Sequence, residues 1–105
     1  MAIEQDIQTL IDTHAVTLFM KGNALFPQCG FSAKVVGILN HLEIPFHDEN
    51  VLESDELRQG IKDFSNWPTI PQLYVKGEFI GGCDIVTELF ENGDLSQIFA
   101  KHNIT

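Results

Sequence analysis

The sequence has few cations, few cysteines and no long apolar run, and each shortage excludes a class of protein. Six Lys and Arg residues stand against fifteen Asp and Glu residues, which gives a formal net charge of -9 at pH 7. Such a charge argues against nucleic acid as a partner, because binding to its phosphate backbone needs clustered cations. The two cysteines, Cys29 and Cys83, are too few for a disulfide-dense secreted domain, so we expect a reducing compartment.

The apolar segments are all of strand length. None approaches the roughly 18 to 20 consecutive apolar residues that span a membrane. The first six residues are acidic and polar, unlike a secretory signal or an Arg-rich transit peptide. We therefore expect a soluble, cytoplasmic protein with no membrane partner. The interior of an organelle is the alternative if a transit peptide has been removed.

What the sequence does contain is enough for one hydrophobic core. Its 105 residues suit one domain over residues 1–105, since domains usually hold about 100 to 200 residues. Hydrophobic residues make up 44% of the chain, and they include eight Phe, one Tyr and one Trp. A core of this composition does not require metal or disulfide staples.

Hydrophobic periodicity predicts alternating helices and strands. Helical spacing covers residues 3–13, the stretch from Phe31 to Pro45, the stretch from Glu53 to Trp67, and residues 85–90 and 95–99; strand-like runs cover 16–20, 46–50, 72–75 and 78–81. Lys76-Gly77 joins the last two strands as a hairpin. This α/β order suits a small sheet with parallel and antiparallel pairs and helices on both faces.

Cys29 lies where a strand gives way, through a loop, to a helix. Backbone N–H groups and the dipole at a helix start stabilise a thiolate, and Lys21 nearby would add to this effect. A lone cysteine is more often inert, but this setting favours a reactive thiol. Cys29-Gly30-Phe31-Ser32 has the spacing of a Cys-x-x-Cys redox motif with serine second. Because serine cannot resolve a mixed disulfide, the thiol either needs a second external thiol or serves as a metal ligand.

Four motifs together resemble the single-domain monothiol glutaredoxins of the CGFS class. They are Phe19-Met20-Lys21-Gly22, Pro27 with Cys29-Gly30-Phe31-Ser32, Trp67-Pro68-Thr69-Ile70-Pro71-Gln72, and Gly81-Gly82-Cys83-Asp84. The resemblance covers essentially the whole chain. It implies a thioredoxin-like fold, with a four-stranded mixed central sheet flanked by about five helices. It also implies a glutathione site and a [2Fe-2S] cluster held between two chains.

Glutathione is a tripeptide with two carboxylates, one amine and one thiol, and the resemblance assigns a receptor to each part. Lys21 and Arg58 resemble the family's ligands for the glycine-end carboxylate, with a plain surface charge as the alternative for each. Ile70-Pro71 resembles its cis-proline step, whose backbone pairs with the cysteinyl unit. Asp84 would hold the amine or simply cap a helix whose N–H groups receive the second carboxylate. The predicted glutathione contacts are Lys21, Cys29, Phe31, Arg58, Ile70, Pro71, Cys83 and Asp84.

Three further residues keep more than one interpretation. Cys83 is a small buried filler, a glutathione contact through its backbone, or a disulfide partner for Cys29, which would need Cα atoms within about 7 Å. Leu25 and Phe26 stand where the family usually carries more polar, often proline-bearing residues. The simpler interpretation packs them under the loop, and the alternative makes them an apolar lip that contacts a second chain or a partner. Trp67 is expected in the core rather than at the ligand.

The resemblance leads to three hypotheses of function. A [2Fe-2S] centre takes four thiolates, which Cys29 and one glutathione from each of two chains would supply in a cluster-bridged homodimer. The first hypothesis is a carrier that receives this cluster from scaffold proteins and transfers it to iron-sulfur acceptor proteins. The second is a glutathione-dependent thiol-disulfide oxidoreductase in which Cys29 attacks glutathionylated thiols, with weak classical glutathione-disulfide activity. The third, a regulatory module that docks on a BolA-like protein, can coexist with the first.

Overall fold

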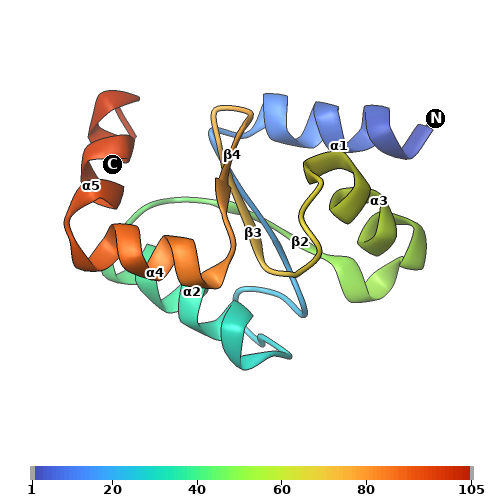
Figure 1. The fold of residues 1–105 in the computed structure, drawn as a ribbon, viewed down its shortest axis with the longest axis horizontal. Helices are drawn as coiled ribbons and strands as arrows, with labels where there is room; N and C mark the ends of the chain where they lie inside the picture. Colours follow the sequence, from blue (N-terminus) through green and yellow to red (C-terminus); the bar gives the residue numbers. More distant parts are fainter. Residues whose placement is uncertain (1, 105) are drawn as a thin grey trace.

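The computed structural model describes residues 2–104, which form a central sheet between two groups of helices (Figure 1). The elements are α1 (Ala2–Thr13), β1 (Val16–Met20), α2 (Gly30–His41), β2 (His47–Asn50), the short 3₁₀ helix η1 (Val51–Glu53), α3 (Asp55–Ser65), β3 (Gln72–Val75), β4 (Glu78–Gly81), α4 (Cys83–Glu91) and α5 (Asp94–Lys101). The predicted order of helices and strands is confirmed, with η1 as an addition.

The four strands lie in the order β2-β1-β3-β4. Strand β1 runs parallel to β2 and antiparallel to β3, which in turn pairs with β4 in an antiparallel hairpin. The predicted mixed sheet is confirmed. The turn of the hairpin has positive φ at both Lys76 (52°) and Gly77 (79°), as the tightest hairpin turns require.

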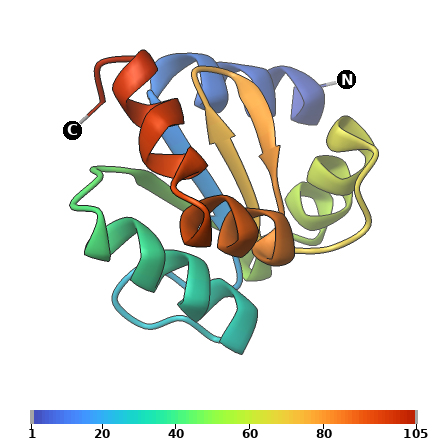
Figure 2. The ribbon, with the colours of Figure 1, turned by 60° about the vertical axis from the view of Figure 1, so that its left-hand side comes forward.

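Helices cover both faces of the sheet. Alternate residues of a strand point to opposite faces, and in β1 Leu18 packs into one apolar cluster while Phe19 packs into the other. The first cluster holds side chains of α2, α4 and α5, and the second holds those of α1 and α3. Figures 1 and 2 both show α1 and α3 on the side of the sheet away from α2 and α4. Because both its faces are covered, β1 is buried along its whole length.

The hydrophobic spacing predicts that helix α2 extends to Pro45, but the helix ends at His41. Glu43 adopts the left-handed conformation (φ 58°), and its N–H donates to the carbonyl of Asn40 at 3.0 Å. The N–H of Ile44 donates to Leu39 O, also at 3.0 Å. This pair of hydrogen bonds is the Schellman ending of a helix, so Ile44 returns to the core without extending α2.

Two other boundaries bear on the site. Helix α3 ends at Ser65 with Asn66 in the left-handed conformation (φ 55°), as predicted, and the chain then enters the Trp67-Pro68 segment. Helix α4 begins at Cys83 rather than at Ile85, which places Cys83 and Asp84 in its first turn. Among residues 2–104, none of the helices combines the length and apolar character that crossing a membrane requires.

Candidate functional site

One cavity of about 440 Å³ brings together residues from the loop after β1, the starts of α2 and α4, and the segment before β3. Its volume lies within the roughly 300–1,000 Å³ of small-molecule sites. All the predicted glutathione contacts except Arg58 line this cavity: Lys21, Cys29, Phe31, Ile70, Pro71, Cys83 and Asp84. We call it the thiol pocket.

Cys29 occupies the position immediately before the first turn of α2. Its backbone is extended (φ -151°, ψ 136°), and its side chain makes no capping hydrogen bond. The backbone N–H of Ser32 is the largest influence that lowers the pKa of the Cys29 thiol below its ordinary value of 9.0; partial burial opposes it, while the N–H of Phe31 and the charge of Lys21 act with it. The predicted activation of the thiol by a helix start and a lysine is therefore supported by the geometry.

Ser32 has a structural use in the position where a dithiol motif would carry its second cysteine. The residue is completely buried, and its Oγ accepts a hydrogen bond of 3.1 Å from the backbone N–H of Lys21. This contact ties the end of β1 to the first turn of α2, so the residue that bears the cation and the helix that bears the thiol are held together.

The loop between Lys21 and Cys29 folds back on itself. The N–H of Gln28 donates to Lys21 O at 2.9 Å, and Gly22 forms an isolated bridge with Pro27. Gly22 has φ 87°, and a Cβ there would lie 2.5 Å from Phe26 O. Only glycine fits such a close approach in the left-handed region, so Gly22 sets the tight base of the loop.

Leu25 and Phe26 do not pack under this loop, contrary to the simpler expectation. Their side chains are 84% and 69% exposed, and Phe31 on the adjoining first turn of α2 is 63% exposed. Asn23 Oδ1 accepts hydrogen bonds from the N–H groups of Leu25 (3.0 Å) and Phe26 (2.8 Å). The loop therefore presents two large apolar side chains to solvent, as the alternative of an apolar lip requires; contact of this lip with a second chain or a partner stays a prediction.

The wall of the thiol pocket is the segment before β3. The Ile70-Pro71 peptide bond is cis, as the family resemblance implies. Buried Gln72 supports this wall, because its Nε2 donates to the carbonyls of Trp67 and Thr69, each at 3.2 Å. Burial raises the pKa of Tyr74 to about 12, so its hydroxyl stays protonated and donates to Gln72 Oε1 at 3.2 Å.

Trp67 is not a core residue, contrary to the sequence expectation. Its side chain is 36% exposed and lines the thiol pocket. Its ring lies 5.8 Å from that of Phe79 between centroids, in a tilted arrangement, so the indole packs beside the β3-β4 hairpin. Because this is the only tryptophan in the sequence, its fluorescence can report on the pocket.

The start of α4 leaves the Asp84 side chain free. The capping residue is Gly82, and no side chain caps this helix, so the interpretation of Asp84 as the helix cap is wrong. Asp84 is exposed in the first turn and lines the thiol pocket. A Cβ at Gly82 would lie 3.1 Å from Trp67 Nε1 and 3.3 Å from Pro71 O, so glycine allows the helix start to approach the wall closely.

Both cysteines are free thiols that are neither fully buried nor fully exposed. Cys83 lines the same pocket as Cys29, and its Sγ lies 4.0 Å from Thr87 Oγ1 in a weak contact. The two thiols are therefore reduced in this structure. Among residues 2–104, no group of three or more His, Cys, Asp or Glu side chains could hold a metal ion.

Sequence reasoning missed one cation of the site. Lys62 lines the thiol pocket, whereas Arg58 is not among its lining residues. Both are half-buried on α3, and their spacing of four residues places them on one face of the helix. That spacing was the signal that could have found Lys62. The role of Arg58 as a glutathione ligand stays a prediction.

The protein has a thioredoxin-like architecture. A thiol activated at a helix start shares one pocket with a cis-proline step, and both lie beside a mixed four-stranded sheet. Residues 16–80 match the model of the glutaredoxin family. The chain is 53% identical over 99 residues to the chloroplastic monothiol glutaredoxin-S14 of Arabidopsis thaliana, covering 94% of this chain and 57% of that protein. It is 58% identical over 92 residues to a ycf64-like monothiol glutaredoxin of Synechocystis, covering 88% and 86%. The chain belongs to the glutaredoxin family and resembles its monothiol members.

Solved structures agree with this assignment. The solution structure of reduced poplar apo GrxS14 is 48% identical, with a TM-score of 0.85 and 96% of each chain covered. A buckwheat glutaredoxin-glutathione complex reaches a TM-score of 0.85 at 21% identity, covering 95% of this chain and 89% of that one, and shows the fold alone. Membership of the monothiol glutaredoxins supports a glutathione-dependent redox or iron-sulfur role in general.

Proposed function

We propose that this protein carries a [2Fe-2S] cluster as cargo between scaffold proteins and iron-sulfur acceptor proteins, with Cys29 and glutathione as cluster ligands. The observation that carries the proposal is the position of Cys29: its thiol, with a lowered pKa, lies at an uncapped helix start in a pocket with room for a small ligand. A thiolate is the form that ligates iron.

The thiol pocket fits glutathione in its charge and its backbone groups. Lys21 and Lys62 offer cations for one carboxylate, and the N–H groups at the start of α4 offer a receptor for the other. Asp84 is free to take the amine. The backbone of Ile70, before the cis-proline, would pair with the cysteinyl unit as an added strand does. Together these groups match the carboxylates, amine and extended backbone of the tripeptide.

The ligand count then requires two chains. A [2Fe-2S] cluster takes four thiolates or their equivalents. Cys29 supplies one and its bound glutathione a second, so two chains and two glutathiones complete the set in a homodimer. Leu25, Phe26 and Phe31 lie exposed in the loop and first turn that flank Cys29, where a second chain or an acceptor would cover them.

Anaerobic reconstitution with iron, sulfide and glutathione tests the proposal. The wild type should become a coloured dimer by absorption spectroscopy and native mass measurement, and Cys29→Ser should stay a colourless monomer. Cys83→Ser is the matched control, because it keeps the backbone of α4 and removes a thiol that is not among the four proposed cluster ligands. A colourless, monomeric wild type would refute the carrier.

The apolar lip has its own test. Replacing both Leu25 and Phe26 with Ser should weaken the cluster-bridged dimer or slow cluster transfer, while the apo protein unfolds at the wild-type temperature, because these side chains bury little in the single chain. Leu52→Ser is the matched control, since Leu52 is also exposed but lies in η1 rather than in the loop before Cys29. Unchanged dimer stability and transfer would remove the lip from the proposal.

The lowered pKa of Cys29 favours a second candidate, a thiol-disulfide oxidoreductase. The Cys29 thiolate would attack the glutathione sulfur of a glutathionylated protein and release the protein thiolate. A second glutathione would then attack the mixed disulfide, freeing Cys29 and forming glutathione disulfide. Rapid turnover of a glutathionylated peptide by Cys83→Ser would favour this enzyme, because that variant keeps no second cysteine that could resolve the disulfide.

Docking on BolA-like proteins, the third hypothesis, would use the same apolar lip and is compatible with the carrier. We also propose a reducing compartment, either the cytoplasm or the interior of an organelle, because the chemistry requires Cys29 to remain a free thiol. The chain spans only 57% of the Arabidopsis relative, so these statements concern the domain described.

A further inference from the structure

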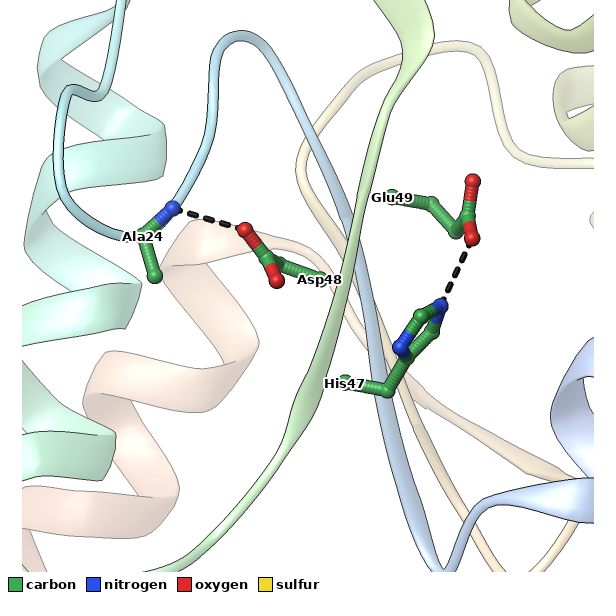
Figure 3. Close-up of polar contacts among 4 residues, drawn as sticks. All are labelled: Ala24, His47, Asp48 and Glu49. Carbon is green, nitrogen blue, oxygen red and sulfur yellow. Dashed lines mark hydrogen bonds and ion pairs between the residues drawn. The ribbon is translucent and has the colours of Figure 1, made fainter.

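Strand β2 carries polar side chains on both of its faces, and the side chains of the two faces make different contacts. Figure 3 shows Asp48 pointing to one side of the strand, toward Ala24, while His47 and Glu49 point to the other side. His47 Nε2 and Glu49 Oε1 lie 2.6 Å apart, and the His47 ring stacks on that of His14 with 3.9 Å between centroids. Neither residue contacts the loop before Cys29 through a hydrogen bond.

Asp48 and Asn50 instead hold that loop. Asp48 Oδ2 accepts a hydrogen bond of 2.8 Å from the N–H of Ala24. Asn50 Oδ1 accepts one of 2.9 Å from the N–H of Gly22. Both side chains are half-buried, so these bonds are partly shielded from competition with water. We call this pair the edge clamp.

The loop of residues 21–28, which begins at the site cation Lys21, also has hydrogen bonds of its own. Residues 21–28 are closed by the Gln28–Lys21 hydrogen bond and stiffened at the tip by Asn23. Internal bonds of this kind hold the shape of the loop but not its place relative to the sheet. The place of the loop is set by its direct continuation from Met20 at the end of β1, by the bond from Lys21 N–H to Ser32 Oγ, and by the edge clamp.

We propose that Asp48 and Asn50 are positioning residues that hold the loop of residues 21–28 against β2 and so keep Lys21 at the thiol pocket. A lysine ammonium sits on a flexible four-carbon stem, so its mean position depends on where its backbone is anchored. Electrostatic attraction falls with distance and with exposure to water. If the loop were released from β2, the Lys21 ammonium would lie farther from Cys29 and from a bound carboxylate on average. Its electrostatic attraction to both would then be weaker.

Asp48→Ala, Asp48→Asn and Glu49→Ala form the test. Asp48→Ala should slow alkylation of Cys29 by iodoacetamide at neutral pH and move its pH profile to higher pH. It should also weaken glutathione binding about fivefold, the factor of one ordinary hydrogen bond, as followed by Trp67 fluorescence. Asp48→Asn should restore both values, because its Oδ1 still accepts from Ala24. Glu49→Ala removes the neighbouring carboxylate on the other face of β2 and should leave both values at wild type.

Asn50→Ala removes the second tie of the edge clamp together with the hydrogen bond by which Asn50 Oδ1 caps η1 through the N–H of Leu52, and thermal unfolding of each variant checks that the fold is retained. Wild-type alkylation profiles in both Asp48→Ala and Asn50→Ala would overturn the proposal. So would an equal loss in Glu49→Ala, since that would reflect a general loosening of β2. The glutathione readout rests on the proposed function, but the alkylation profile does not. A wild type that fails to assemble a cluster would thus remove the carrier and leave this comparison intact.

Discussion

The residues that precede helices α2 and α3 differ by one side-chain atom, sulfur against oxygen, yet the two helix starts serve different purposes. Ser54 precedes α3 and Cys29 precedes α2, each in an extended backbone with nearly the same φ (-152° and -151°). Ser54 Oγ accepts a hydrogen bond of 3.1 Å from the N–H of Leu57, three residues on. Cys29 makes no such bond, and the equivalent N–H, that of Ser32, lowers the pKa of its thiol instead.

The difference shows that the N–H groups of a helix start can either stabilise the fold through a cap or remain available to a reactive group. At α3 the cap and the acidic Asp55 and Glu56 of the first turn satisfy the positive end of the helix, which stabilises the fold. At α2 the first turn has no acidic residue and no cap. Its N–H groups remain available to a charge that forms only when Cys29 ionises.

The largest expected effect comes from placing serine before both helices. Cys29→Ser should abolish alkylation at position 29 and cluster assembly, because oxygen replaces the one sulfur ligand that the chain itself supplies. The thiol of Cys83 remains open to the reagent, so peptide mass measurement is needed to locate the alkylated residue. At the same time the new hydroxyl can cap α2, so this variant should be about 1 kcal/mol more stable than Cys29→Ala. Denaturant unfolding of both variants measures the difference. Equal stability would mean that the start of α2 cannot accept a cap.

Removing the cation beside this start should have the next largest effect. Lys21→Gln should weaken glutathione binding about tenfold, since a charge-assisted contact with a carboxylate is lost. It should also raise the pKa of Cys29, but only in part, because the N–H of Ser32 is the larger cause of its lowering. Alkylation against pH and Trp67 fluorescence give the two readouts. Lys101→Gln on α5, away from the pocket, is the matched control, and a similar loss in that variant would point to net charge alone.

The corresponding change at α3 should affect stability and nothing else. Ser54→Ala removes the cap of α3 and should cost about 1 kcal/mol, or about 5 °C in the unfolding temperature of a domain this size. Its Cys29 alkylation profile should match that of the wild type, because α3 start residues do not line the thiol pocket. A shifted profile would show that the two starts are coupled and would break the comparison.

The sequence predicted best the parts whose causes are local. Strand β1 and the β3-β4 hairpin have the predicted bounds, because apolar runs and a Lys-Gly turn act over a few neighbouring residues. The place of Cys29 and Lys21 in one pocket followed from the motif and the strand-loop-helix order. Helix α2 ended early because Glu43 adopts a left-handed conformation, which hydrophobic spacing does not encode.

What escaped prediction depends on contacts between distant segments. Asp48 and Asn50 bind groups 24 and 28 residues earlier in the chain, and buried Gln72 supports the pocket wall through carbonyl groups. The exposure of Leu25 and Phe26 was equally hidden, since a hydrophobic loop residue is buried only if another element covers it. Sequence patterns name such residues as polar or apolar but do not name their partners.

The smallest expected effect is a pH dependence of stability that only the start of α2 should show. The folded-state pKa of Cys29 lies below its ordinary value of 9.0, so ionisation of this thiol favours the folded state. That contribution is fully present above pH 9 and is lost as the pH falls through the lower folded-state pKa. The free energy of unfolding of the wild type should therefore rise relative to Cys29→Ala between neutral pH and pH 9, then level off.

Ser54→Ala should show a constant difference from the wild type over this range, because neither serine nor alanine titrates. Denaturant unfolding at several pH values distinguishes the two patterns. A flat difference for Cys29→Ala would show that the N–H groups of α2 favour the thiolate no more than water does.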